Sequence, residues 1–521
     1  MLKSTGPGSL RYLIFTAALL FPHIGGGQSV EHVTINAKAA TTPFPHFWEQ
    51  TFGSGRAILT LRESYREDLR AVKSITEFRY VRFHAILHDE VGVYNEDEHG
   101  DPIYNFSYVD QIYDGLLKNG VRPFVEISFM PKKLAFNPDA LHPFWYKQNV
   151  SPPKSIERWD HLINHFAQHL IDRYGIDEVS QWYFEVWNEP NIDFWNGIPR
   201  LESYLDLYAH TANGLKAVSP RLRVGGPATA ASEWVPEFLK FAADNHVPVD
   251  FVTSHGYADD TVENLFHTKE DIPMDDRVCR AIGKVRDQIR TSTMPNLPLY
   301  WTEWNVQGER NSRDTIFVGP GLANTVRECD GLVQGMSFWT FSDVFEEGGP
   351  GVQPFQGAFG LRAEGGINKP SFYDFALLHQ LGNNRIAATS PNVIVTTKED
   401  GSLALAAWNI VDPGSVPELA RTPDEPTPQL AGTAGPTRTL ELEFSGVAAN
   451  AEVSISRVDA KHGNVLPFFY AMKAPHYPTP QQVEQLNKET ALGNPQKSRL
   501  DHGQLTLTLT PNSLVLVTLK P

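Results

Sequence analysis

Two patterns of hydrophobic and polar positions alternate along residues 43–383. Short runs rich in β-branched and aromatic residues are typical of buried strands, whereas apolar residues that recur every three to four positions are typical of amphipathic helices. Helical patterns cover residues 66–75, 109–120 and 155–175, and the last two end in Gly120 and Gly175, as helices often do. The short runs predict eight strands, at residues 51–57, 80–87, 122–129, 182–189, 222–228, 250–257, 299–305 and 336–343.

A strand followed by a helix, repeated eight times, predicts an α/β fold, a (β/α)₈ TIM barrel over residues 43–383. Residues 384–521 instead contain short alternating runs separated by Gly, Pro, Asn and Asp, which predict a second, smaller β-sandwich domain. Residues 29–42 share this alternation and are expected to add a strand to the sandwich. The Pro-rich stretches at 412–436 and 472–481 are expected to be long loops.

The N-terminus has the order of charged, apolar and small residues that marks an export signal. Lys3 and Arg11 precede an apolar stretch at residues 12–21, and glycines follow at residues 25–27. This order predicts a signal peptide over residues 1–28 and a secreted or periplasmic protein; the alternative is a disordered leader without that role. No other run approaches the roughly 18 apolar residues that a membrane span needs.

Composition narrows the class of partner. The formal net charge of −16 argues against nucleic acid or an anionic membrane, because both require a basic face. A small neutral or polar substrate fits better. Cys279 and Cys329 are the two cysteines of the chain, and they permit one disulfide or two free thiols.

Two glutamates end predicted barrel strands, where the catalytic groups of such barrels lie. Glu189 closes the fourth strand in the run VWNEPN, and Glu303 closes the seventh in WTEWN. One exposed glutamate is usually a solvated charge, but two inside apolar strands need a reason, because a buried unpaired carboxylate is costly. Facing carboxylates across a cleft are what cleavage of a glycosidic bond requires.

Further motifs in the same order along the chain resemble glycoside hydrolase family 39, the family of β-xylosidases and α-L-iduronidases. The resemblance implies a clan of retaining barrel glycosidases with the acid/base on strand four and the nucleophile on strand seven. The bacterial β-xylosidase branch fits better, chiefly through HDEVGVY and FSDVFEE. The motifs are GSGRA (53–57), RFHAILHDEVGVY (82–94), EVWNEPN (185–191), FWTFSDVFEE (338–347), FQGAFGL (355–361) and INKPSFYDF (367–375).

The resemblance implies roles for matching residues. Glu189 is expected to be the general acid/base, Glu303 the nucleophile, and Asn188 the partner of the sugar 2-hydroxyl. Arg82, inside the second strand, is expected either to hold Glu303 ionised or to form an ordinary buried ion pair with Glu185.

Four residues near strand ends are further candidates for the sugar pocket. Tyr257 is expected to donate to Glu303, and His255, two residues earlier, to contact the sugar. His84 and His88 flank the end of the second strand, and the resemblance puts at least one of them in the pocket. The alternative for each histidine is a core residue with its hydrogen bonds satisfied.

The eighth strand and the loop after it supply the remaining candidates. Trp339 resembles the aromatic floor beneath the reacting sugar, with simple core packing as its alternative. Glu346 and Glu347 are expected to bind outer hydroxyls of a terminal sugar, although acidic loop residues are commonly just solvated. Phe129, after the third strand, is a weaker candidate for a pocket wall.

His161, His165 and His169 lie four positions apart on one helical face, a spacing that zinc sites use. Their helix belongs to the outer ring, remote from the strand ends, and the expected chemistry needs no ion. We therefore predict no metal and no cofactor.

The function expected from the sequence is a retaining, exo-acting hydrolase that releases terminal xylose from β-xylosides and xylo-oligosaccharides. Its carboxyl groups should lie about 5 to 5.5 Å apart, with the higher pKa on Glu189. The alternatives are an α-L-arabinosidase, an iduronidase-like enzyme and, in another class, a non-catalytic carbohydrate-binding protein. Linkage, substrate length and oligomeric state stay open.

Overall fold

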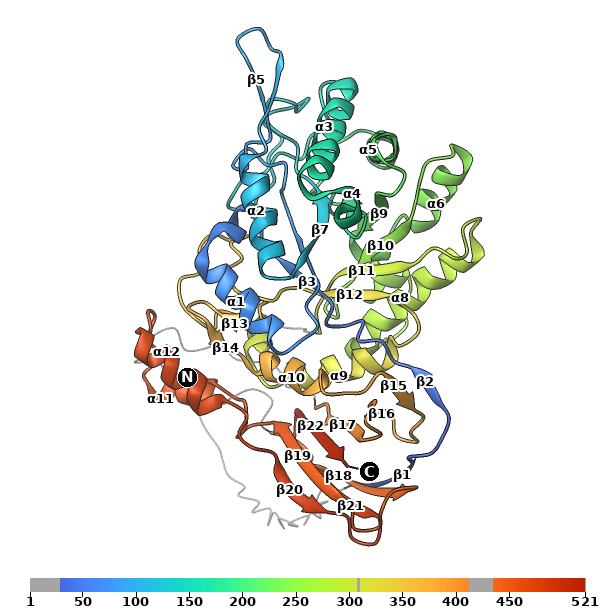
Figure 1. Cartoon of the computed structure of the whole chain (residues 1–521), viewed down its shortest axis with the longest axis vertical. Coiled ribbons are helices and arrows are strands. Elements are labelled where there is room, and N and C mark those ends of the chain that lie inside the picture. Colours follow the sequence, from blue (N-terminus) through green and yellow to red (C-terminus); the bar gives the residue numbers. More distant parts are fainter. Residues whose placement is uncertain (1–28, 307–309, 412–433, 521) are drawn as a thin grey trace, which may run out of the picture.

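The computed structural model describes residues 29–306, 310–411 and 434–520. Its larger part is a closed barrel of eight parallel strands, which confirms the predicted (β/α)₈ fold (Figure 1). The strands, in barrel order, are β3 (Thr51–Ser54), β4 (Tyr80–Phe83), β7 (Arg122–Ile127), β8 (Tyr183–Val186), β9 (Arg223–Thr229), β10 (Phe251–His255), β11 (Leu299–Trp304) and β12 (Gly335–Phe338).

One long helix follows each barrel strand and covers the outside of the barrel. Helix α3 shows how the sequence defines such an element: the Ser155 side chain accepts the Arg158 N–H at its start, and Gly175 ends it with a φ of 79°. The ring helices are α1 (Glu63–Lys73), α2 (Ser107–Lys118), α3 (Ile156–Tyr174), α5 (Arg200–Val218), α6 (Val235–Asp244), α8 (Met274–Thr291), α9 (Val318–Glu328) and α10 (Pro370–Leu378).

Shorter elements fill the connections between these units. Strands β5 (Tyr94–Glu96) and β6 (Pro102–Tyr104) form a projecting hairpin (Figure 1). The others are α4 (Ile176–Val179), α7 (Val262–Phe266), the 3₁₀ turns η1 (Ala57–Leu61), η2 (Ala230–Ser232) and η3 (Arg310–Asp314), and the paired β13 (Arg362–Ala363) and β14 (Ile367–Asn368).

Several barrel strands end earlier than the sequence pattern predicted. The expected strand at 182–189 stops at Val186, because Trp187 and Glu189 have positive φ angles of 73° and 42°. Glu189 therefore lies in the turn above the strand, where its backbone N–H donates to the carbonyl of Ala228, 2.8 Å away. The strand expected at 80–87 likewise ends at Phe83, before Ala85 turns the chain with a φ of 71°.

The barrel interior is layered by polarity. Aromatic rings from the strand starts fill its N-terminal end, and the hydroxyl groups of Tyr183 and Tyr300 lie 2.8 Å apart there. Above them lies a buried charged layer made by Arg82, Glu126 and Glu185. These rings keep water from the base of the barrel, so the polar groups of the charged layer must form their hydrogen bonds and ion pairs with one another.

Two further sheets make up the smaller domain and confirm the predicted sandwich. Strand β1, from before the barrel, pairs in parallel with β18, and β2 joins the edge of the larger sheet. The larger sheet has the order β2 (Thr41–Pro43), β15 (Asn384–Ile386), β16 (Val393–Thr397), β17 (Leu403–Asn409), β22 (Ser513–Leu519), β19 (Glu452–Val458) and β20 (Gln496–Arg499); the smaller has β1 (Ser29–Asn36), β18 (Arg438–Ser445) and β21 (Gln504–Leu509).

Two helices in this part of the chain were not expected. Helix α11 (Leu466–Ala471) and helix α12 (Pro480–Thr490) lie beside the barrel end of the domain (Figure 1). The loop expected at 472–481 is therefore shorter, because Thr479 caps α12 and Pro480 occupies its first turn, where proline is favoured. Most of the loop expected at 412–436, and the signal peptide expected at 1–28, lie outside the described residues.

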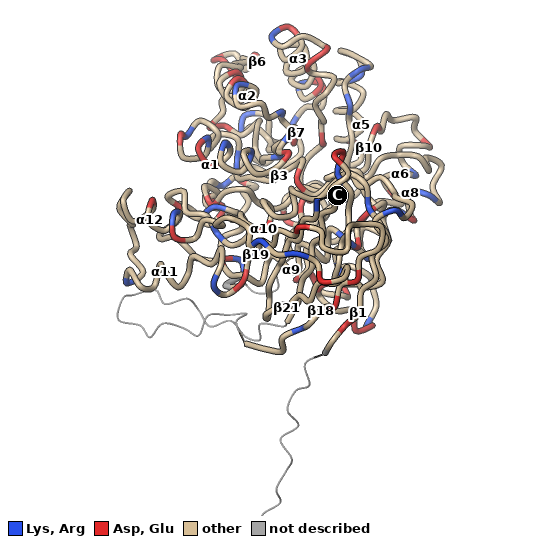
Figure 2. Tube along the Cα trace, turned by 60° about the horizontal axis from the view of Figure 1, so that its bottom comes forward, with Lys and Arg blue, Asp and Glu red and all other residues tan. Residues whose placement is uncertain are grey.

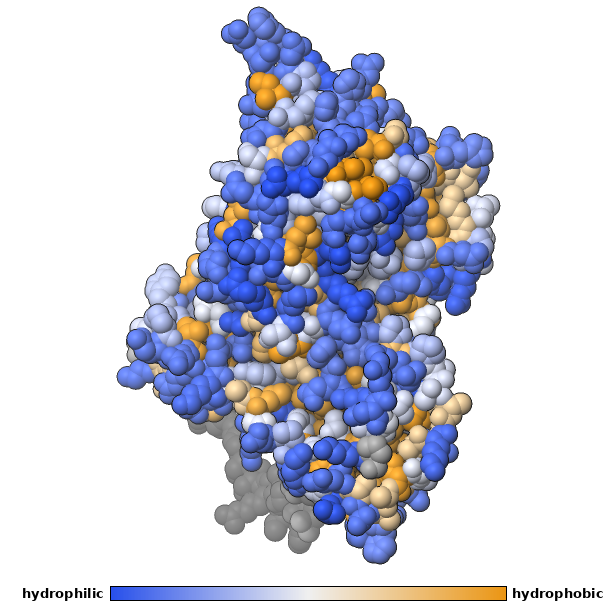
Figure 3. All heavy atoms as spheres, in the orientation of Figure 1, coloured by the Kyte–Doolittle hydropathy of each residue, from blue (hydrophilic) through white to orange (hydrophobic). Residues whose placement is uncertain are grey.

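Basic and acidic positions are interspersed along the trace (Figure 2), and the face in Figure 3 is mostly hydrophilic with separate hydrophobic patches. Cys279 and Cys329 form a disulfide that joins α8 to the end of α9, which resolves the two options left open by the sequence. Within the described ranges, none of the helices is long and apolar enough to span a membrane.

Candidate active site

Arg82 lies at the centre of the charged layer and joins both expected partners. Its Nη1 donates to Glu303 Oε1 at 2.7 Å and its Nε to Glu185 Oε2 at 2.5 Å. Its Nη2 lies 2.9 Å from Glu126 Oε2 and donates to Asn188 Oδ1 at 3.0 Å. Burial alone would lower the pKa of Arg82, but the surrounding carboxylates raise it, so the guanidinium stays charged.

Glu303, the expected nucleophile, is held at both of its oxygens. It is the next-to-last residue of β11, with Oε1 bound to Arg82 and Oε2 accepting from the Tyr257 hydroxyl at 2.6 Å. Burial and the nearby Glu303 and Glu189 raise the pKa of Tyr257 well above its usual value, so this phenol stays a donor. The expected contact between Tyr257 and Glu303 is therefore present.

Glu189, the expected acid/base, has a different environment. Burial raises its pKa to about 7, although the positive charges of His84 and Arg82 oppose the shift. One carboxylate oxygen of Glu189 and one of Glu303 lie within 4.8 Å of each other. The arrangement therefore presents a protonatable carboxyl beside a carboxylate that is fixed by a cation and a phenol.

His255 does not point at an open pocket, contrary to the expected sugar contact. It is fully buried at the end of β10, with Nδ1 2.9 Å from Glu189 Oε1 and Nε2 3.1 Å from Thr302 Oγ1. Burial lowers its pKa to about 4. Both ring nitrogens already have protein partners, so His255 acts on Glu189 and has no nitrogen free for the sugar.

Asn188 precedes Glu189 and is oriented by Arg82. Because its Oδ1 accepts from Arg82 Nη2, its NH₂ group is directed away from the guanidinium. This orientation provides a hydrogen-bond donor beside the two carboxylates.

The two histidines after β4 differ in charge. The Nδ1 of buried His84 lies 2.6 Å from Glu126 Oε2, and its Nε2 lies 3.7 Å from Glu347 Oε1. Burial would lower the pKa of His84, but the neighbouring carboxylates raise it to about 10. Burial lowers the pKa of His88 to about 4, and its Nδ1 accepts the N–H of Glu90. His84 is thus a cation 3.9 Å from Glu303, and His88 is neutral.

Trp339 follows β12 and forms one side of the charged layer. Its ring centroid lies 5.9 Å from the Arg82 guanidinium carbon and 4.9 Å from the His84 ring. A Cβ at Gly53 would lie 2.1 Å from this ring, which explains the glycine in GSGRA. Phe129 is fully buried against Trp187, so it belongs to the core behind the site.

Glu346 is engaged by protein cations, contrary to its expected contact with outer sugar hydroxyls. Its Oε2 accepts from Arg56 Nη1 at 2.8 Å, and its Oε1 accepts from Arg62. Because both oxygens are used, Glu346 positions the loop and its charge is neutralised. Glu347 keeps a partly exposed side chain beside His84, and burial raises its pKa.

Sequence reasoning missed two polar residues of the buried layer, Glu126 and Thr302. Glu126 binds both Arg82 and His84, and Thr302 donates to Glu185 Oε1 at 2.8 Å. A signal for Glu126 was present: it is a charged residue between apolar neighbours in a strand buried on both faces, where charges occur only with partners. Nothing in the sequence distinguishes Thr302 from an ordinary strand residue.

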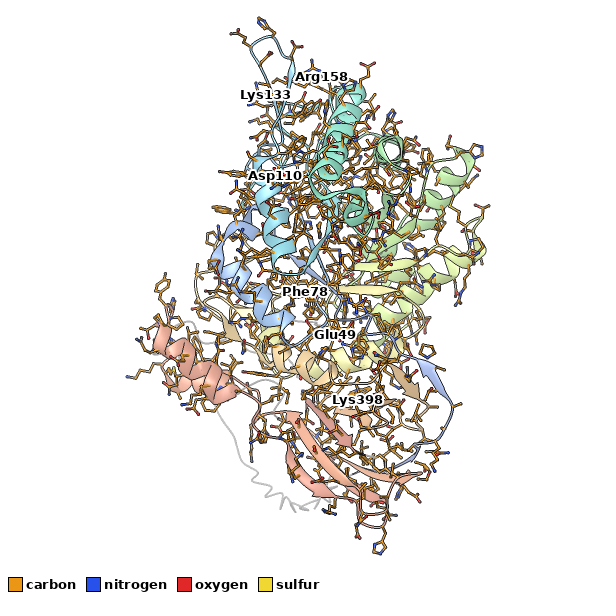
Figure 4. The ribbon with its side chains drawn as sticks, viewed as in Figure 1. Glu49, Phe78, Asp110, Lys133, Arg158 and Lys398 are labelled. Carbon is orange, nitrogen blue, oxygen red and sulfur yellow. A yellow bond between two sulfur atoms is a disulfide. The ribbon has the colours of Figure 1, made fainter. Side chains whose placement is uncertain are left out.

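The three histidines of α3 do not come together on a metal-like site. The His165 ring packs at a tilt against Tyr104, with centroids 4.4 Å apart, and His169 Nε2 lies 2.6 Å from Asp110, which Figure 4 labels. His161 is not part of any group of three possible ligands among the described residues.

One cluster of possible metal ligands lies away from the site, at the base of the barrel. Glu49, labelled in Figure 4, lies before β3 and contacts His379 at the end of α10. Its Oε1 lies 2.5 Å from His46 Nδ1 and 2.9 Å from His379 Nδ1. Two imidazole donors satisfy this buried carboxylate without an ion.

A closed parallel barrel that presents paired carboxylates at the C-terminal ends of its strands is an architecture of the glycosidases. This chain belongs to the glycosyl hydrolases family 39, whose model matches residues 31–499, and it is a glycosidase. It is 36% identical to a β-xylosidase of Geobacillus stearothermophilus over 493 residues, covering 91% of this chain and 92% of the relative. It is 33% identical to a β-xylosidase of Caldicellulosiruptor saccharolyticus over 505 residues, covering 95% and 99%.

Solved structures agree with the sequence matches. A family 39 β-xylosidase from Caulobacter crescentus superposes with a TM-score of 0.79 at 32% identity, covering 94% of this chain and all of that structure. The expected family is thereby confirmed.

Proposed function

We propose that this protein is a retaining, exo-acting β-xylosidase that releases terminal xylose by double displacement. The observation that carries the proposal is the closeness of the two carboxylates, with one oxygen of each within 4.8 Å of the other. Retaining glycosidases hold their carboxyl groups about 5 to 5.5 Å apart, whereas inverting ones need about 6.5 to 9.5 Å to admit a water. The close spacing favours a nucleophile over a water-activating base.

In the first step, Glu303 Oε attacks the anomeric carbon while the bond to the leaving oxygen breaks. Glu189 gives its proton to that oxygen, and a glycosyl ester forms on Glu303. Arg82 and Tyr257 hold the attacking carboxylate in place through its two oxygens. The Asn188 NH₂ group is available for the sugar 2-hydroxyl, a contact that strengthens in the transition state.

In the second step, Glu189 takes a proton from water as the water oxygen attacks the anomeric carbon. The ester bond to Glu303 breaks, and the sugar leaves with its original configuration. Glu189 must therefore alternate between acid and base, a task suited to its pKa of about 7.

The choice of β-xylose rests on the two curated relatives and the solved structure whose names state that activity. The charge of Glu346 is neutralised by Arg56 and Arg62, so it does not discriminate against a uronate. Glu347 remains beside His84, with a partly exposed side chain.

The test is hydrolysis of aryl β-xyloside, α-arabinoside and α-iduronide by the wild type, by Glu303→Ala and by Glu484→Ala. Glu484 lies exposed on α12 and serves as the matched control. We expect preference for the β-xyloside, a loss on the order of 1,000-fold or more in Glu303→Ala, and no change in the control. Preference for another glycoside would replace the sugar, and an active Glu303→Ala variant would overturn the mechanism.

We also propose that the protein is exported through residues 1–28. The order of Lys3, Arg11 and the apolar stretch at 12–21 supports this location. N-terminal sequencing of protein from the periplasm or medium of the producing cell is expected to begin near Gln28. Mature protein that retains Met1 would contradict export.

A further inference from the structure

A chain of hydrogen bonds leads from the buried layer to the proposed acid/base. Arg82 Nε donates to Glu185 Oε2 at 2.5 Å, and Glu185 Oε1 accepts from the Thr302 hydroxyl at 2.8 Å. Thr302 Oγ1 lies 3.1 Å from His255 Nε2, and His255 Nδ1 lies 2.9 Å from Glu189 Oε1. Four residues of this chain of hydrogen bonds are buried, namely Arg82, Glu185, Thr302 and His255. Water therefore does not substitute for these contacts.

The order of donors along this chain is set at its Arg82 end. Glu185 is paired with a guanidinium, so it faces Thr302 as an acceptor. A hydroxyl has one proton, and Thr302 uses it toward Glu185. Thr302 Oγ1 can then meet His255 only as an acceptor, which requires a proton on Nε2 of His255.

The neutral ring of His255 carries one proton, so its Nδ1 is left with a lone pair. Burial keeps the ring neutral by lowering its pKa to about 4. The 2.9 Å contact between this lone pair and Glu189 Oε1 is a hydrogen bond only when Glu189 carries the proton. Ionised Glu189 would place a carboxylate oxygen against the lone pair.

We propose that Thr302 is a positioning residue, which fixes the tautomer of His255 and thereby holds Glu189 in its protonated form. The inference rests on the proposed acid/base role of Glu189 and deepens it. The same repulsion acts once Glu189 has given its proton to the leaving oxygen. The resulting carboxylate then takes a proton from water more readily, so both steps use the same contact.

Other charged or titratable groups also face Glu189, and apart from His255 their charges do not depend on Thr302. His84 and Arg82 favour its ionised form, while negative neighbours favour its protonated form. The groups around it are His84 and Arg82 from β4 and its loop, Glu126 from β7, His255, Tyr257 and Asp260 from β10 and its loop, Glu303 from β11, and Glu347 after β12. A change at Thr302 leaves the charges of these groups, apart from His255, in place.

The experiment compares Thr302→Val with Thr302→Ser. Valine has nearly the shape of threonine but no hydroxyl, whereas serine keeps the hydroxyl. The alkaline limb of kcat/KM against pH for an aryl β-xyloside reports ionisation of the general acid in the free enzyme. In Thr302→Val we expect this limb to move to lower pH by about 0.5 to 1, the effect of one hydrogen bond on an ionisation. The acidic limb should stay in place, and Thr302→Ser should keep the wild-type limb.

An unmoved alkaline limb in Thr302→Val would overturn the proposal, and so would an equal movement in Thr302→Ser. A separate variant distinguishes this failure from failure of the proposed function. If Glu189→Ala keeps the alkaline limb, Glu189 is not the acid; if that variant loses the limb while Thr302→Val leaves it unmoved, only the role of Thr302 fails.

A second measurement on the wild type does not depend on a variant at Thr302 folding. Long-range ¹H–¹⁵N correlation spectra of the ¹⁵N-histidine-labelled protein distinguish the two neutral tautomers of each ring. The His255 signals are assigned by their loss in His255→Gln, among the 18 histidines of the chain. A proton on Nε2 is the expected result, and a proton on Nδ1 would overturn the proposal.

Discussion

Glu189 and Glu303 carry the same functional group but meet different neighbours. Glu303 is bound by the Arg82 cation and the Tyr257 phenol, both of which stabilise a carboxylate. Glu189 faces the neutral ring of His255, and burial raises its pKa to about 7. At the scale of single residues, the surroundings therefore suit two identical side chains to the two different roles that we propose for them.

The raised pKa of Glu189 predicts the pH range of the enzyme. The proposed mechanism needs protonated Glu189, so a raised pKa extends activity upward in pH, and kcat/KM for an aryl β-xyloside should fall as the pH passes about 7. In Glu189→Ala this alkaline limb should disappear. Activity should drop about 10²- to 10⁴-fold for poor leaving groups, because they need the acid, and much less for a dinitrophenolate.

Stopped-flow or initial-rate pH profiles for two leaving groups measure this prediction. The Glu484→Ala variant is the control for loss of a glutamate elsewhere. An alkaline limb that persists in Glu189→Ala, or an equal loss for both leaving groups, would contradict the assignment.

The contacts of a residue could be predicted from the sequence where its position along a strand determines its neighbours. Tyr257 lies two residues beyond β10, and Glu303 is the next-to-last residue of the neighbouring β11, so their contact could be predicted. Glu346 could not be assigned in this way, because Arg56 and Arg62 lie 290 and 284 positions away in the chain. The partner of His255 Nδ1 was equally hidden, since the position of Glu189 depends on the turn that carries it.

At the scale of elements, strand order could be predicted but strand ends could not. Alternation of strand and helix identifies the barrel, since few folds repeat that pattern eight times. The position of Glu189 depends on the left-handed backbone of Trp187 and Glu189, a conformation that ordinary side chains rarely adopt and that no sequence pattern here indicated. Tertiary contact with Ala228 on the next strand stabilises it.

The first barrel strand provides a test of close packing beneath the site. In Gly53→Ala the new methyl carbon would lie 2.1 Å from the Trp339 ring, so the ring must move away from Arg82 and His84. We expect kcat/KM to fall about 10-fold or more, because a small displacement of a site residue strongly lowers the reaction rate. The melting temperature should fall as well, because the core is overpacked.

Gly283→Ala is the matched control for Gly53→Ala. No heavy atom lies within 4 Å of a Cβ at Gly283, which is inside α8. This variant should keep wild-type activity and gain about 0.5 to 1 kcal/mol of unfolding free energy from the lower flexibility of alanine. Equal activity in the two variants would show that the packing of Trp339 on Gly53 is unimportant.

At the scale of the whole molecule, the smaller domain shares a hydrophobic core with the barrel. One face of its larger sheet packs against the smaller sheet. The opposite face, which includes Trp408 and Leu516, shares a single apolar core with the barrel. The sequence predicted the sandwich from alternation, but alternation does not reveal that both faces of one sheet are buried.

This shared core makes the stability of the whole chain depend on Trp408. Its side chain is fully buried, so Trp408→Ala should lower the free energy of unfolding by about 3 to 5 kcal/mol. The KM for β-xyloside should stay near the wild-type value, because the strand ends that hold the site are distant. Tyr477→Ala, at a residue 84% exposed, is the control. Denaturant unfolding that gives equal values for both variants would contradict the shared core.

In the proposed mechanism Glu303 forms a glycosyl ester, and the sugar leaves with its configuration retained. The most direct test is ¹H NMR of the first product of aryl β-xyloside hydrolysis, recorded before mutarotation. We expect β-xylose to appear first and the α anomer to grow in slowly. Initial release of α-xylose would mean a single displacement by water and would contradict the assignment of Glu303 as the nucleophile.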